Sequence, residues 1–123
     1  MATIKFRVIP ESGREDLISL FELIKSSKEA GIFNSEEIWS RLPGYVKSNF
    51  FRGDKGESID NRWDFLSWVD ALEHCEQEFI DINFSWSGGK LEFNQLSYPS
   101  GGVEATEEIV KAFNGKITSN NAI

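Results

Sequence analysis

The sequence predicts an α+β domain in which a small antiparallel sheet, made from an N-terminal strand and a C-terminal hairpin, carries three to four helices packed mainly on one face. Apolar and polar residues alternate over residues 3–9 and again over residues 79–96, as they do in half-buried strands. The intervening and following segments repeat apolar residues at helical spacing. The 123 residues, 40% of them hydrophobic, suffice for one core. We therefore expect a single domain over residues 1–118, with a frayed tail at 119–123.

The N-terminal strand places Ile4 and Phe6 on one side and Lys5 and Arg7 on the other. Pro10 ends this pattern. The alternation predicts one face buried against the core and one basic face turned outward.

Two helices are predicted next. Ser12 and Glu15 have the spacing of a capping box, and Gly31 predicts the end of this long first helix. Asn34 is a candidate N-cap of a short second helix, which Pro43 and the glycine after it close. Residues 43–61 then mix aromatic residues, glycines and charges, which predicts a long loop.

A third helix is predicted to begin at Asn61 or Asp64, and a last helix ends at Gly115. Residues 116–118 are a candidate short strand after it. The predicted core stripe of the third helix consists of Phe65, Val69, Leu72 and Phe79.

Gly88 and Gly89 predict the turn of the hairpin, because glycine accepts the positive φ angles of a two-residue turn. This register pairs apolar with apolar positions, namely Trp86 with Leu91 and Phe84 with Phe93. We expect the N-terminal strand to pair with the hairpin, its basic outer face complementing Asp81 and Glu92. Burial is the simpler expectation for each of the four tryptophans, although Trp86 flanks the turn and is a candidate interface anchor.

The formal net charge of −7 is confined to one half of the chain. Residues 1–62 hold ten basic and ten acidic side chains, whereas residues 63–123 hold three basic and ten acidic ones. We expect this acidic half to attract basic surfaces and to repel nucleic acid.

Several chemistries lack the residues they require. Cys75 and His74 are helical neighbours, which point about 100° apart and do not meet as a nucleophile and its base. Asp70, His74 and Glu78 share a polar helical stripe, which we interpret as a solvated face without a metal ion. No cofactor motif is found. The single cysteine and the absence of a signal-peptide pattern or membrane-spanning run favour a cytoplasmic protein.

These observations favour a small acidic protein-binding module, such as an inhibitor or immunity-type protein that covers a basic surface of a partner protein. An enzyme or small-ligand binder, with a pocket under residues 45–61, is one alternative; a structural subunit of a homo-oligomer is another. The candidate partner-binding residues are Asp81, Trp86, Glu92, Glu104, Glu107 and Glu108. The candidate pocket residues are Tyr45, Arg52, His74 and Tyr98.

Overall fold

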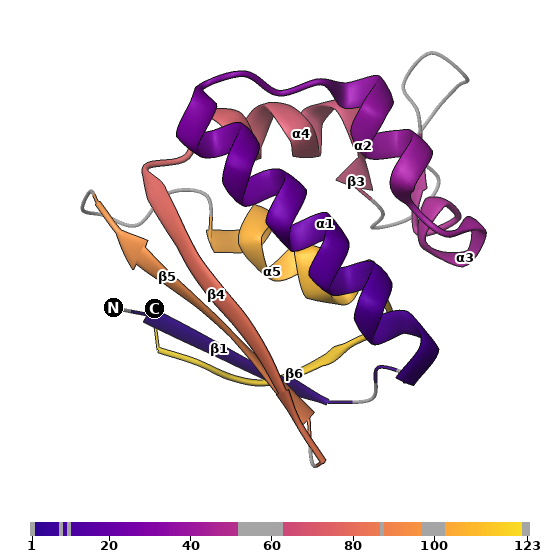
Figure 1. Ribbon diagram of the computed structural model, residues 1–123, viewed down its shortest axis with the longest axis vertical. Coiled ribbons are helices and arrows are strands. Elements are labelled where there is room, and N and C mark those ends of the chain that lie inside the picture. The colour runs from indigo at the N-terminus through magenta and orange to yellow at the C-terminus, as the bar shows by residue number, and fades with distance from the viewer. Residues whose placement is uncertain are drawn as a thin grey trace.

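The computed structural model describes residues 2–7, 9, 11–51, 63–86, 88–96 and 103–121. These residues form a four-stranded antiparallel sheet with helices on one side of it, which confirms the predicted α+β class (Figure 1). The sheet has the strand order β4-β5-β1-β6, with β1 at Ala2–Arg7, β4 at Gln77–Ser85, β5 at Gly88–Gln95 and β6 at Lys116–Asn120. The helices are α1 (Glu11–Ala30), α2 (Ser35–Arg41), α3 (Gly44–Lys47), α4 (Phe65–His74) and α5 (Val103–Lys111).

Strand β1 lies inside the sheet, between β5 and β6. Ile4 and Phe6 are buried and Lys5 and Arg7 are exposed, as the alternation predicts. The predicted pairing with the hairpin is confirmed. The predicted charge complementarity is wrong, however, because Lys5 lies directly opposite Lys90.

Three helix caps follow the sequence signals, but the predicted capping box is wrong, because α1 already begins at Glu11 and Ser12 lies inside the helix. Gly31 has a φ of 74° just after α1, a conformation that glycine adopts without strain. The Asn34 side chain accepts a hydrogen bond from the Glu37 backbone N–H at the start of α2. At α4 the Asp64 side chain accepts from the Ser67 backbone N–H in the same way.

The predicted third helix is too long. Helix α4 ends at His74, and Phe79 lies on β4, where it is buried against the core. A spacing of seven between Leu72 and Phe79 fits a helix stripe, but the chain changes direction at Cys75 and continues as a strand.

Part of the predicted loop at 43–61 is regular structure. It contains α3 and the short strand β2 (Phe50–Phe51), which pairs in parallel with β3 (Trp63–Asp64). Val46 and Phe50 are buried, and their burial fixes this segment against the core. Residues 52–61 lie outside the described residues.

The hairpin register differs from the predicted one. Phe84 pairs with Gly89 and Ser85 with Gly88, so the chain reverses before the two glycines. Both glycines instead allow β5 to approach β1 closely. A Cβ at Gly88 would lie 2.4 Å from the carbonyl oxygen of Phe6, and one at Gly89 would lie 2.6 Å from the Phe6 ring.

Strand β6 is longer than predicted. It extends to Asn120, and the Thr3 N–H donates to the Asn121 side chain at 2.7 Å. The prediction of a frayed tail is therefore wrong for residues 119–121, because these residues find backbone partners on β1.

Candidate functional site

One face of the four-stranded sheet is turned away from the helices, and we call it the open face. Alternation along each strand brings polar side chains to it, and no described element covers them. The open face consists of Thr3, Lys5, Arg7, Glu78, Asp81, Asn83, Ser85, Lys90, Glu92, Asn94, Lys116 and Ser119.

The end of the open face nearest the start of β4 is acidic, and we call Glu78, Asp81 and Glu92 the acidic end. The structure brings two predicted partner-binding residues together here, because Asp81 lies directly opposite Glu92. Amide side chains hold these carboxylates: Asn94 donates to Glu78 at 2.8 Å, and Asn83 donates to Asp81 at 3.1 Å. The amides orient the carboxylates but do not neutralise them.

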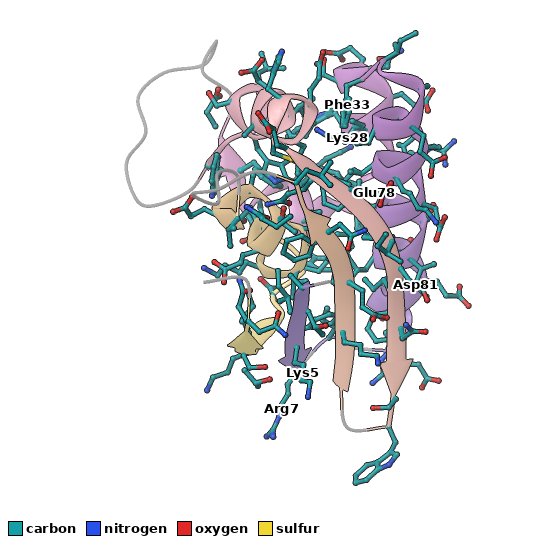
Figure 2. The ribbon with its side chains drawn as sticks, turned by 90° about the vertical axis from the view of Figure 1, so that its left-hand side faces the viewer. Lys5, Arg7, Lys28, Phe33, Glu78 and Asp81 are labelled. Atoms are coloured by element: carbon teal, nitrogen blue, oxygen red, sulfur yellow. The ribbon has the colours of Figure 1, made fainter. Side chains whose placement is uncertain are left out.

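The end nearest the hairpin turn is basic, and we call Lys5, Arg7, Lys90 and Lys116 the basic end. Figure 2 shows Lys5 and Arg7 at this end, and Glu78 and Asp81 nearer the start of β4. Lys5 lies opposite Lys90, and Arg7 lies opposite Lys116. A cavity of about 360 Å³ opens here, lined by Lys5, Phe6, Arg7, Asn83, Phe84, Ser85, Gly88, Gly89, Lys90 and Thr118.

Trp86 lies at the hairpin turn and is 94% exposed. The expectation of burial is therefore wrong for this tryptophan, and its candidacy as an interface anchor rests on this exposure. The cause is the register: Leu91, which the sequence pairs with Trp86, pairs with Ile82 instead. Trp86 thus extends beyond the last pair of the hairpin, where no described residue covers it.

The three glutamates predicted on the last helix do not share the open face. Helix α5 lies on the helical side of the sheet and contacts β6 and α4 (Figure 1). Glu104 is exposed, and Glu107 accepts a hydrogen bond from Asn120 at 3.0 Å and lies 3.8 Å from Lys111. Of the six predicted partner-binding residues, Asp81 and Glu92 therefore lie on the open face, Trp86 lies at the hairpin turn, and the three glutamates lie on the other side of the sheet.

Among the described acidic residues, Glu108 has a pKa that burial clearly shifts. Burial raises its pKa from 4.5 to about 7, although the charge of Lys111 acts in the opposite direction. At neutral pH this carboxyl is protonated for much of the time, so it contributes less negative charge than the sequence implies.

This raised pKa predicts a pH-dependent stability. Below pH 4.5 the carboxyl is neutral in both the folded and unfolded states, and the free energy of unfolding falls as the pH rises from 4.5 through about 7. We expect Glu108→Gln to stabilise the protein by about 1–2 kcal/mol at pH 8.5 and by little at pH 4.5, after allowing for solvent around the half-buried side chain. Urea unfolding at both pH values measures this, with Glu104→Gln as the exposed control; equal effects at the two pH values would contradict it.

The structure describes two of the predicted pocket residues, Tyr45 and His74, and places them in separate contacts. The Tyr45 hydroxyl lies 2.7 Å from where a Cβ on Gly13 would stand, and its ring packs edge-on against Phe113 at 6.3 Å. His74 instead lies at the end of α4, where Nδ1 is 3.0 Å from the Asp70 carbonyl oxygen. The other two predicted pocket residues, Arg52 and Tyr98, lie outside the described residues.

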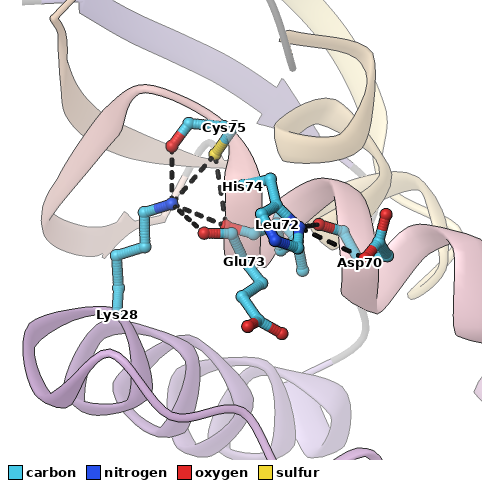
Figure 3. A network of polar contacts seen from close by, with 6 residues as sticks. All are labelled: Lys28, Asp70, Leu72, Glu73, His74 and Cys75. Carbon is cyan, nitrogen blue, oxygen red and sulfur yellow. Dashed lines mark hydrogen bonds and ion pairs between the residues drawn. The ribbon is translucent and has the colours of Figure 1, made fainter.

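Lys28 makes a polar network at the end of α4 (Figure 3). Its Nζ donates to the carbonyl oxygens of Leu72 at 2.9 Å, Glu73 at 2.8 Å and Cys75 at 2.5 Å. These carbonyls are left without helical partners at a helix C-terminus, where a cation is also favoured by the helix dipole. Lys28 therefore caps α4 from a neighbouring helix.

The contacts at this end of α4 also argue against Cys75 and His74 acting as a nucleophile and its base. The Cys75 thiol donates to the Leu72 carbonyl oxygen at 3.3 Å, while His74 is bound to Asp70. Burial raises the pKa of the Cys75 thiol, and the nearby Lys28 lowers it by less. Cys75 is thus a protonated, half-buried thiol at neutral pH rather than an activated nucleophile.

Among the residues that the structure describes, no group of three histidine, cysteine, aspartate or glutamate side chains is arranged to hold a metal ion. Glu78 lies on β4 and so leaves the helical stripe predicted with Asp70 and His74. The helices described here include none that is long and apolar enough to cross a membrane.

Comparisons of this chain with protein families, with curated proteins and with solved structures find no match. The open face, with its two charged ends and exposed Trp86, is the feature on which a functional proposal rests. The sequence does not reveal the basic end, because Lys5 and Lys90 become neighbours only through the pairing of β1 with β5.

Proposed function

We propose that this protein is a binding module that places the acidic end of the open face against a basic surface of a partner protein, as an inhibitor or immunity-type protein would. The observation that carries the proposal is the acidic end, which is uncovered by any described element and lies on a hydrogen-bonded sheet. Asp81 and Glu92 lie side by side despite their mutual repulsion, and a basic partner surface would relieve it.

The exposed Trp86 adds an apolar anchor to this interface. Tryptophan is enriched among the residues that contribute most to protein–protein binding, because one large ring buries much apolar surface in a partner's pocket. Its position at the hairpin turn places it at one edge of the open face, with the acidic end toward the other. A partner that fits this arrangement presents basic side chains opposite the acidic end and an apolar pocket at the hairpin turn, with the basic end of the open face between them.

The glutamates of α5 lie on the opposite side of the sheet and are not part of the proposed interface. They therefore supply a charge-matched control on the same molecule. We place the protein in the cytoplasm under this proposal, in keeping with its single, half-buried Cys75.

Affinity capture from the native cell lysate at low and moderate salt tests the proposal. We expect the wild-type chain to retain a basic protein and the Asp81→Lys/Glu92→Lys variant to lose it. With the purified partner, the association rate at low salt should fall at least about tenfold in this variant. Mass spectrometry identifies the retained protein, and stopped-flow mixing measures the rate.

The control variant is Glu22→Lys/Glu104→Lys, which makes the same change in net charge on exposed helix positions. We expect it to retain the partner and to slow association by much less. Equal slowing by the two variants would show that only net charge matters and would contradict an interface on the open face.

A further inference from the structure

Lys5, Arg7 and Lys90 of the basic end line a cavity, and we propose that this cavity binds a small oxyanion, a compound that carries phosphoryl or carboxyl groups. The inference goes beyond the proposed partner interface, since it concerns the basic end of the open face and an anionic ligand, whereas the partner interface uses the acidic end. It rests on three observations: unpaired like charges, the lining of the cavity, and the close approach of the strands that form it.

The charges at this end repel one another. Lys5 and Lys90 are directly opposite, and so are Arg7 and Lys116 in the next row. Like charges in such cross-strand pairs destabilise a sheet. None of the four makes an ion pair with any residue in the described part of the chain, although the protein has 20 acidic residues against 13 basic ones. A bound anion would turn this repulsion into attraction.

The cavity offers hydrogen-bond donors of the kinds that oxyanions use. Arg7 supplies a planar guanidinium, which can bind two oxygens at once, and Lys5 and Lys90 supply ammonium groups. Thr118 adds a hydroxyl to the lining. The volume of about 360 Å³ lies within the range of small-molecule sites.

The glycines of β5 make this arrangement possible. Gly88 has a φ of 153°, and a Cβ there would stand 2.4 Å from the Phe6 carbonyl oxygen and 3.6 Å from Arg7 Cγ. A side chain at this position would push β5 away from β1 or fill the space beside Arg7. Glycine therefore keeps the cations of the two strands close together and the cavity open.

Thermal unfolding with inorganic phosphate, pyrophosphate and citrate, each compared with sodium chloride at equal ionic strength, tests the inference. We expect a saturable rise in Tm of about 4–7 °C when the anion is present at tenfold its Kd. Pyrophosphate and phosphate distinguish a phosphoryl ligand from citrate, a carboxyl ligand. Isothermal titration calorimetry of the same anions gives the Kd.

Anion binding should be at least about tenfold weaker in the Lys5→Gln/Lys90→Gln variant, because each substitution removes a charge-assisted hydrogen bond to the anion. Without anion, Lys90→Gln alone should raise Tm by about 1–4 °C, since it removes the repulsion from Lys5. A more stable protein that no longer responds to anions would distinguish loss of a site from loss of the fold.

Lys25→Gln/Arg41→Gln is the matched control, with the same charge change on helix positions. It should keep the full anion response. The inference fails if chloride raises Tm as much as the oxyanions do, if the two double variants respond alike, or if only a long polyanion such as single-stranded DNA binds. Failure here leaves the effect of Asp81→Lys/Glu92→Lys on partner binding unchanged, so the two proposals are separately testable.

Discussion

Replacing Trp68 with alanine is expected to lower the free energy of unfolding by about 3–5 kcal/mol, the largest effect we predict for a single substitution. Trp68 has 0% of its surface exposed, and its ring centroid lies 4.8 Å from that of Phe50 and 6.0 Å from that of Phe65. Its Nε1–H also donates to the Ala105 carbonyl oxygen at 2.9 Å and so joins α4 to α5. Alanine would leave a large cavity and remove the hydrogen bond between α4 and α5.

Urea unfolding measures this loss, with two companion variants. Trp68→Phe keeps an aromatic ring but removes the N–H, and should cost an intermediate amount of about 1–3 kcal/mol. Trp86→Ala replaces the 94% exposed tryptophan and should change stability by less than about 0.5 kcal/mol. A loss below about 1 kcal/mol for Trp68→Ala would show that this ring is not part of the core.

The second large effect is expected for Lys28→Met, which should lower the free energy of unfolding by about 2–4 kcal/mol. Methionine preserves the apolar stem of lysine but removes the ammonium that binds the carbonyl oxygens of Leu72, Glu73 and Cys75. Hydrogen bonds from a charged donor are stronger than neutral ones, and partly buried carbonyls are not fully rehydrated when the donor is lost.

Lys25→Met is the control, because it removes a lysine from the same helix one turn earlier. We expect it to change stability by less than about 0.5 kcal/mol. Hydrogen exchange adds a local measurement: Lys28→Met should speed exchange of the Cys75 amide, which donates to Ala71 at the end of α4. Equal stabilities of the two variants would contradict a capping role for Lys28.

Local signals in the sequence were sufficient for most of the elements. The alternation around Ile4 and Phe6 predicts β1, and Gly31 and Asn34 predict the boundary between α1 and α2, because caps depend on residues next to each other in the chain. The helix-covered antiparallel sheet follows from this order of elements.

The hairpin register shows where local reasoning fails. Gly88 and Gly89 form a strong turn signal, but glycine is also required wherever another backbone comes close. Here the close neighbour is Phe6, which lies far away in the sequence and is brought near only by folding. The same error led to the expectation that Trp86 is buried.

The candidate site was predictable only in part. Asp81 and Glu92 belong to one hairpin, so their proximity follows from its two strands. The basic end combines Lys5 from the electrically neutral half of the chain with Lys90 from the acidic half. Counting charges along the sequence does not detect this cluster. Such a count places Lys5 and Lys90 in different segments, although they are neighbours across the sheet.

The central position of β1 also constrains the order in which the protein is built. Ala2 pairs with Phe93 and Ile4 pairs with Asn120, so β1 needs partner strands that are synthesised long after it. Until those residues leave the ribosome, β1 has no partner strand in the four-stranded sheet. Non-local pairing of this kind slows folding. The apolar side of β1 therefore stays unpaired while the residues between it and its partner strands are synthesised, which is the interval in which a chaperone would act.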